Sequence, residues 1–169
     1  MAGTPIEAAR ESIARAVATL DAAGVPDEAL ADYVTPKRVL FVNRAPVMVP
    51  RGRVWPLGVL LLDRGGGLHA TGTITRAVPA GYPGYQSPGV EVRRGYRAAA
   101  FKADFAEGDT VNFDTVVIDL ERLDAASAPL LFDGERVLVR WNATFPAQTR
   151  ALDVYLADRV SLLVDPPGA

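Results

Sequence analysis

Few side chains in this sequence could perform chemistry by themselves. The chain of 169 residues contains one histidine, His69, and no cysteine. The lack of cysteine excludes disulfides, thiolate zinc sites, iron–sulfur clusters and thiol nucleophiles within the chain. A metal site of several histidines is excluded as well. Any imidazole chemistry must therefore use His69, which we expect on a strand over residues 68–76, on one polar face with Thr71, Thr73 and Thr75.

Two familiar catalytic motifs are missing. The sequence has no Gly-x-Ser-x-Gly elbow, and Ser87 is better explained as the residue that caps a helix than as a nucleophile. The triple glycine at 65–67 is followed by a strand pattern and no lysine, so we interpret it as a turn and not as a phosphate loop.

The acids at Asp109, Asp114 and Asp119 recur every five residues. On a strand this spacing sends neighbouring side chains to opposite faces, so the acids are not expected to hold a metal ion. We interpret them as turn and edge residues. The hypothesis of a catalytic pair of carboxylates, as in glycosidases, stays open, although nothing in the sequence selects a particular pair.

The strongest candidate for a binding site is an arginine cluster that follows a loop rich in proline, glycine and tyrosine at 79–89. We expect a helix from 87 to 101, on which Arg93 and Arg97 lie one turn apart. Guanidinium groups beside aromatic rings suit phosphate, carboxylate or nucleotide ligands. The predicted ligand-binding residues are Arg93, Arg94, Arg97, Tyr82, Tyr85 and Tyr96. The alternative is an exposed helix whose arginines pair with acids elsewhere in the fold.

Charge is distributed unevenly along the chain. The net charge of −2 hides a segment of net +9 at residues 34–103, which is followed by one of net −8 at residues 104–135. Three outcomes are open: the two segments neutralise each other, which we favour slightly, or the chain self-associates through opposite charges, or the basic face meets an anionic partner. The acidic balance makes nucleic-acid binding an unfavoured function.

Hydrophobic periodicity predicts the elements that must position these residues. Helices are expected at 4–23, 26–33, 87–101 and 146–163. Strands are expected at 38–43, 47–49, 53–62, 68–76, 110–118, 130–132 and 135–141. The first helix has a Thr-x-x-Glu capping box at Thr4 and Glu7. Together they predict one α+β domain over residues 1–169, with a mostly antiparallel, strongly bent or barrel-like sheet of about six strands and N-terminal and C-terminal helices packed on it.

We expect a bacterial protein without a metal or cofactor. We also expect it to be cytoplasmic and to span no membrane, since no signal peptide or apolar run of membrane length is present. The leading hypothesis is a non-catalytic binding or assembly module for a small anionic ligand or a protein partner, acting as a homo-oligomer, most simply a dimer. The alternative is a hydrolase or transferase for a phosphorylated or carboxylated substrate, with His69 as the base and the arginines as an anion clamp.

Overall fold

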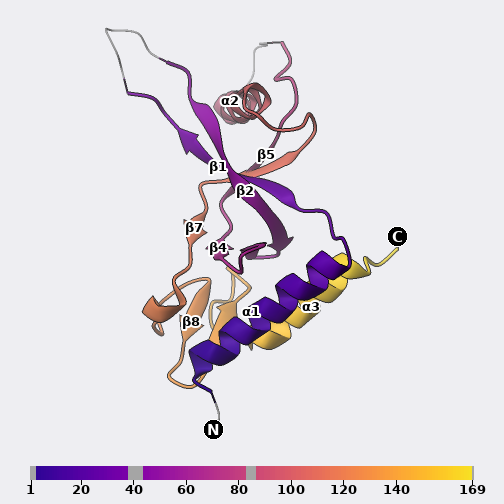
Figure 1. The fold of residues 1–169 in the computed structure, drawn as a ribbon. Coiled ribbons are helices and arrows are strands. Elements are labelled where there is room, and N and C mark those ends of the chain that lie inside the picture. Colours follow the sequence, from indigo (N-terminus) through magenta and orange to yellow (C-terminus); the bar gives the residue numbers. More distant parts are fainter. Residues whose placement is uncertain (1–2, 38–43, 83–86, 169) are drawn as a thin grey trace. The chain divides into compact units, whose positions relative to one another are not determined.

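The computed structural model describes residues 3–37, 44–82 and 87–168, and it has an α+β fold (Figure 1). The α-helices are α1 (Pro5–Ala22), α2 (Pro88–Lys102) and α3 (Leu152–Val164), with a short 3-10 helix at Leu120–Arg122. The strands are β1 (Glu28–Val34), β2 (Val47–Leu57), β3 (Leu60–Asp63), β4 (Leu68–Ala70), β5 (Thr73–Arg76), β6 (Thr110–Phe113), β7 (Val116–Val117), β8 (Leu130–Phe132), β9 (Val137–Arg140) and β10 (Thr149–Ala151).

The chain forms two compact units, each built from segments that are distant in sequence. Unit 1 comprises residues 1–27, 54–71 and 116–169, and unit 2 comprises residues 28–53 and 72–115. Each unit has a hydrophobic core of its own. The division falls inside β2 and not at a linker, so composition alone could not reveal it. The single domain expected over residues 1–169 stays a prediction.

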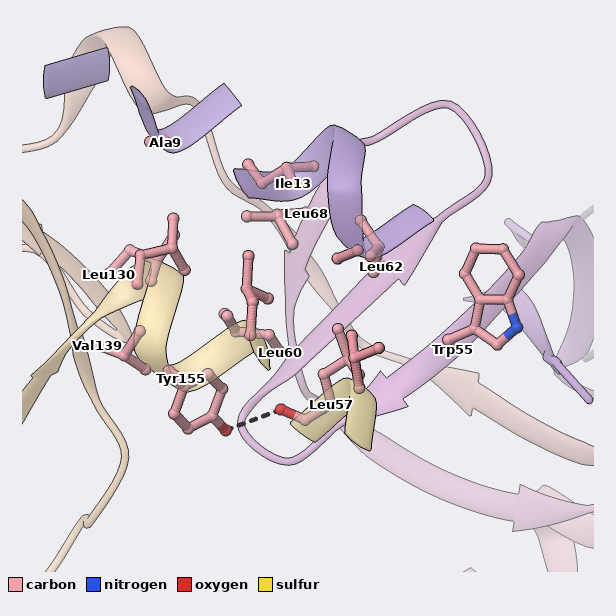
Figure 2. Close-up of a cluster of buried hydrophobic side chains, with 14 of the residues drawn as sticks. Ala9, Ile13, Trp55, Leu57, Leu60, Leu62, Leu68, Leu130, Val139 and Tyr155 are labelled. Carbon is pink, nitrogen blue, oxygen red and sulfur yellow. Dashed lines mark hydrogen bonds between the residues drawn. The ribbon is translucent and has the colours of Figure 1, made fainter. Parts of the chain in front are cut away.

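Unit 1 is organised around α1 and α3, which lie side by side (Figure 1). Thr4 and Glu7 form the predicted capping box at the start of α1, in which the Thr4 hydroxyl accepts from the Glu7 amide at 3.2 Å and the Glu7 carboxylate accepts from the Thr4 amide at 2.6 Å. The helices cover a core that also includes Trp55 and the β3 residues Leu60 and Leu62 (Figure 2). Trp55 is fully buried and donates from its indole nitrogen to the Val25 carbonyl at 2.9 Å.

Tyr155 of α3 holds the β2–β3 hairpin in place. Its hydroxyl donates to the Leu57 carbonyl at 2.8 Å and accepts from the Val59 amide at 3.0 Å (Figure 2). Gly58 lies between these two residues with a φ of 72°. A Cβ atom at Gly58 would approach the Tyr155 hydroxyl to 2.4 Å, so the turn requires glycine both for its backbone conformation and for this close contact.

In unit 2, α2 packs on strands β5 and β6. The core combines alanines of β1 and α2 with Met48, Val111 and Phe113. Strands β1 and β6 pair in parallel, with Ala29 opposite Val111, whereas β5 and β6 are antiparallel. Because parallel strands are joined by long connections, their pairing brings distant parts of the chain together.

The predicted α+β class is confirmed, whereas the predicted sheet is only partly right. A mixed sheet of seven strands has the order β5-β6-β1-β2-β3-β4-β7, and β10, β9 and β8 form a separate antiparallel sheet. Among the described residues, β5 and β7 are open edges, so the seven strands do not close into a barrel. The β1–β6 pair is parallel because its strands come from remote segments, which local patterns do not reveal.

Two predicted helices differ from the structure. The helix expected at 26–33 is strand β1, in which three consecutive residues, Ala29, Leu30 and Ala31, are buried. Burial on both faces of a strand removes the alternation by which strands are recognised. The last helix begins at Leu152 and not at Pro146, because residues 149–151 pair with β9 as strand β10.

Three predicted strands are interrupted. Residues 53–62 form two strands around the turn at Gly58, and residues 68–76 divide at Gly72. A Cβ atom at Gly72 would lie 2.2 Å from the Asp114 carbonyl oxygen. The third interruption separates β6 from β7 at Asp114, whose φ is 54°. Glycine and aspartate permit these sharp changes of direction. The strand expected at 38–43 lies outside the described residues.

We predict that Tyr155→Phe lowers the free energy of unfolding by about 1–3 kcal/mol, since it leaves a buried amide and carbonyl without their partner. Urea denaturation measures the change. Tyr82→Phe is the matched control, because Tyr82 is 96% exposed and should not affect stability. Equal stability of the two variants would show that the Tyr155 hydroxyl does not hold the hairpin.

Candidate functional site

Helix α2 carries the predicted arginine cluster, and the local sequence explains where it begins. Ser87 adopts an extended N-cap conformation, although its side chain forms no capping hydrogen bond, and Pro88 occupies the first helical position. Glu91 in the first turn and Lys102 in the last turn both complement the helix dipole. The predicted helix is therefore confirmed, with bounds shifted by one residue.

One aromatic side chain and a few alanines attach α2 to unit 2. Ala99 and Ala100 are buried, and Tyr96 packs against Tyr33 of β1 and Phe113 of β6 with ring centroids 5.2 and 4.9 Å apart. Burial raises the pKa of Tyr33, and the neighbouring Tyr96 and Asp114 raise it further. In the structure Tyr96, predicted to bind ligand, is a packing residue that orients the helix.

Arg93 and Arg97 lie on the exposed surface of α2. Neither guanidinium forms a hydrogen bond or ion pair with any residue that the structure describes. This distinguishes them from the arginines that do have a carboxylate partner. Those arginines are Arg10, Arg51, Arg53, Arg64, Arg94 and Arg150. The expected alternative, in which the cluster pairs with acids of the fold, therefore does not apply to Arg93 and Arg97.

Arg94 has a different environment from its neighbours. Its side chain is 25% exposed and donates to the Glu91 carboxylate at 2.9 Å. Its Nε atom is buried without a hydrogen-bond partner. Arg94 therefore has an internal partner for part of its charge, and of the three predicted arginines only Arg93 and Arg97 have all their donors free for a ligand.

The surface has several hollows of about 390–440 Å³, and one of them is lined in part by α2, the helix that carries the arginines. It has a volume of about 420 Å³ and lies between the 79–82 segment and the C-terminal half of α2. Tyr82, another predicted ligand residue, lines it together with Phe101 and Lys102. Tyr85 lies outside the described residues. Sequence reasoning did not select Phe101, although its position four residues after Arg97 placed both on one helix face.

His69 belongs to strand β4 of unit 1, whereas the arginine cluster belongs to unit 2. The imidazole is 12% exposed, with Nε2 3.5 Å from Oδ2 of Asp63. Its Nδ1 atom is buried without a hydrogen-bond partner. The Asp63 carboxylate also accepts from the amides of Gly65 and Gly67, each at 2.8 Å. His69 thus contributes to the predicted glycine turn, and neither unit by itself contains both the imidazole and the arginines.

The polar face predicted for residues 68–76 is wrong in its second half. Thr75 is buried, whereas Ile74 is 59% exposed. The chain changes direction at Gly72, so that β4 pairs with β3 and β7, and β5 pairs with β6. The alternation that begins at His69 therefore does not continue past the break.

The acidic segment serves turns and ion pairs, one of which joins Glu121 to Arg10 in unit 1. Asp109 binds Arg53 at 2.8 Å, which joins the basic and acidic segments within unit 2. The carboxylates of Asp119, Asp124 and Asp133 accept hydrogen bonds from backbone amides two or three residues ahead. Over the ranges that the structure describes, no three histidine or acidic side chains are placed to hold a metal ion. The interpretation of these acids as turn residues agrees with these contacts.

The charge asymmetry of the sequence becomes an asymmetry between the units. Unit 1 has eight basic and thirteen acidic residues, a net charge of −5, and unit 2 has ten basic and seven acidic residues, a net charge of +3. The basic segment is therefore only partly neutralised within unit 2. An anion approaching α2 meets a unit of net positive charge, which favours its association.

We predict that stability falls in acid partly through Asp124 and Asp133. Hydrogen bonds from Ser127 and Ala126 lower the pKa of Asp124, and those from the Glu135 and Arg136 amides lower the pKa of Asp133, both from an ordinary value of 3.8. Each ionised carboxylate therefore stabilises the fold above that pH, and the contribution is lost as pH falls through the lower folded pKa.

Urea denaturation between about pH 6 and pH 2 tests this titration. Asp124→Asn/Asp133→Asn should be less stable than the wild type at pH 6 and nearly equal to it at pH 2. Asp165→Asn is the control, because the Asp165 side chain forms no hydrogen bond or ion pair with a described residue. A stability difference that persists unchanged at pH 2 would contradict the assignment.

Comparisons with known proteins add no functional assignment. No protein-family model, no curated protein and no solved structure matches the chain. Within residues 3–37, 44–82 and 87–168, none of the helices has the length and apolar character needed to cross a bilayer. The candidate site therefore rests on its own geometry: a packed helix of unit 2 carries two exposed arginines without a partner among the described residues, and its C-terminal half lines a hollow with Tyr82 and Phe101.

Proposed function

We propose that unit 2 is a binding module that recognises a small anionic ligand through Arg93 and Arg97 of α2. The observation that carries the proposal is that both guanidinium groups are exposed and have no partner among the residues that the structure describes. Six other arginines of the chain pair with a carboxylate among the described residues. Arg93 and Arg97 have their donors free while their backbone belongs to a packed helix.

The chemistry of the two side chains suits this role. Residues four apart on a helix lie about one turn apart on the same surface, so Arg93 and Arg97 can approach one ligand together. A guanidinium presents its donors in a planar fork that matches the oxygen atoms of phosphate and carboxylate groups. Two such groups on one surface favour an anion with several acceptor oxygens over a single chloride-like ion.

The attachment of α2 supports recognition as well. Tyr96, Ala99 and Ala100 attach the helix to unit 2, so the arginines need not order a mobile segment when they bind. A site whose backbone is already positioned loses less conformational entropy on binding. The ligand therefore has to order only two side chains.

The enzymatic alternative has less support. It requires His69 as a base within reach of the arginine clamp, and the two belong to different units. The imidazole is instead mostly covered and lies beside Asp63 in the β3–β4 hairpin. No observation favours an enzyme over a binding module, so we do not propose a reaction. Binding of a protein partner and formation of a homodimer through the charged surfaces stay predictions.

A thermal-shift experiment with pyrophosphate tests the proposed function. A ligand that binds only the folded state adds about 2.7 kcal/mol of stability at a hundred times its Kd, so the melting temperature should rise. In Arg93→Gln/Arg97→Gln the Kd for pyrophosphate should increase about tenfold or more, because charge-assisted hydrogen bonds are lost.

Arg122→Gln/Arg136→Gln is the matched control, since it removes the same charge from exposed positions of unit 1. This control should retain the full response to pyrophosphate. Equal weakening in both double variants would show that net charge, and not the α2 surface, attracts the anion. No response to pyrophosphate, phosphate or citrate in the wild type would overturn the proposal and leave a protein partner as the remaining reading.

A further inference from the structure

The hollow between the 79–82 segment and α2 indicates what the ligand contains in addition to its anionic group. Its walls come from the 79–82 segment and from Ala98, Phe101 and Lys102 of α2. The lining is predominantly apolar, and Lys102 is the charged residue among the side chains that line it. A volume of about 420 Å³ falls within the range of roughly 300–1,000 Å³ that is typical of small-molecule pockets.

Two aromatic rings in this hollow are unusually exposed. Tyr82 is 96% exposed and Phe101 is 44% exposed. Large apolar side chains gathered on one surface mark binding sites more often than scattered ones do. Aromatic rings that are open to solvent also serve as platforms on which flat ring systems stack, as in proteins that bind nucleotides and single-stranded nucleic acids.

Phe101 of α2 connects the arginines to the hollow, because it lines the hollow and lies one turn after Arg97. Arg93, Arg97 and Phe101 follow one another at intervals of four residues, which places them in one row on the surface of α2. Lys102 follows Phe101 directly and so lies outside this row, and it contributes a second type of cation to the hollow. An anion held by the arginines would therefore have its body beside Phe101.

We propose that the ligand of unit 2 is a small aromatic phosphate of the nucleoside monophosphate class. Its flat ring occupies the hollow against Tyr82 and Phe101, and its phosphate binds Arg93 and Arg97. This inference rests on the proposed function, to which it adds the identity of the uncharged part of the ligand. An inorganic anion would use the arginines but would leave the apolar hollow unfilled.

Single-stranded nucleic acid also offers a flat base together with a phosphate. The size of the hollow favours a small ligand instead. The hollow accommodates one ring system, and the chain as a whole has a net charge of −2. A polyanion would encounter the acidic unit 1 as well as unit 2, whereas a monophosphate encounters only the local surface.

Isothermal titration calorimetry of the full chain separates the two parts of the ligand. The probes are AMP, ribose 5-phosphate, which has the same phosphate without the base, and adenosine, which has the base without the phosphate. AMP should bind about tenfold or more tightly than ribose 5-phosphate, because base stacking on an aromatic side chain strengthens binding by such a factor. Adenosine should bind more weakly than AMP by a similar factor.

Substitutions in the hollow should change only the ring-dependent part of binding. Tyr82→Leu and Phe101→Leu keep an apolar side chain but remove the aromatic ring, and each should weaken AMP binding several-fold while ribose 5-phosphate binding stays unchanged. Phe145→Leu is the matched control, because Phe145 is 56% exposed and belongs to unit 1. Tyr82 is almost fully exposed, so its substitution tests the site without risk to folding.

The outcomes distinguish this inference from the proposed function. Equal affinity for AMP and ribose 5-phosphate, both lost in Arg93→Gln/Arg97→Gln, would overturn the aromatic ligand and retain anion recognition. If neither AMP nor ribose 5-phosphate binds in a way that depends on Arg93 and Arg97, both the proposed function and this inference would be overturned. Tighter binding of a single-stranded hexanucleotide than of AMP, with the same dependence on Phe101, would overturn the assignment to a small ligand and favour nucleic acid.

Discussion

The surface that we assign to ligand binding depends on the packing of Tyr96 against Tyr33 and Phe113. Helix α2 buries few other side chains, namely Ala99, Ala100 and part of Ala103. Small side chains allow the helix to approach the strands closely but contribute little apolar area, so the aromatic contacts supply much of its attachment. Because Tyr96 faces the core, Arg93 and Arg97 on the neighbouring part of the helix are directed to solvent.

Acidic and basic side chains have different roles in the two units. In unit 1, aspartates cap turns that the long C-terminal segment requires, and their carboxylates are used by backbone amides. In unit 2, basic residues exceed acids, and several arginines, Arg93 and Arg97 among them, have no partner among the described residues. The same chain therefore uses acids mainly for local structure and leaves part of its basic charge available for an external anion.

Local signals in the sequence predicted the elements whose causes are local. The capping box at Thr4 and Glu7 marked the start of α1, and Pro88 after Ser87 marked the start of α2. Strand β1 was mistaken for a helix, because its consecutive buried residues are explained only by pairing with β6 in a distant segment. The hairpin at Gly58 was missed for a related reason, since the Tyr155 hydroxyl that completes it comes from the last helix.

The candidate site shows the same limit. The spacing of Arg93 and Arg97 placed them on one surface of a helix. It could not show, however, which arginines have internal partners. Arg94, adjacent in sequence, pairs with Glu91, and Tyr96 packs against Tyr33 and Phe113. Conversely, Phe101 became a candidate only when the fold placed the 79–82 segment beside it. Whether a side chain has an internal partner, and whether it is exposed, depends on the three-dimensional arrangement of the chain.

The most direct measurement of the central claim is a map of backbone and arginine side-chain resonances by NMR during a titration with pyrophosphate. We expect the largest chemical-shift changes at Arg93 and Arg97, including their guanidinium signals, with smaller changes at Phe101 and Lys102. Resonances of the exposed Arg122 and Arg136 in unit 1 should stay unchanged. Changes spread evenly over all exposed arginines, or centred on unit 1, would contradict recognition by α2.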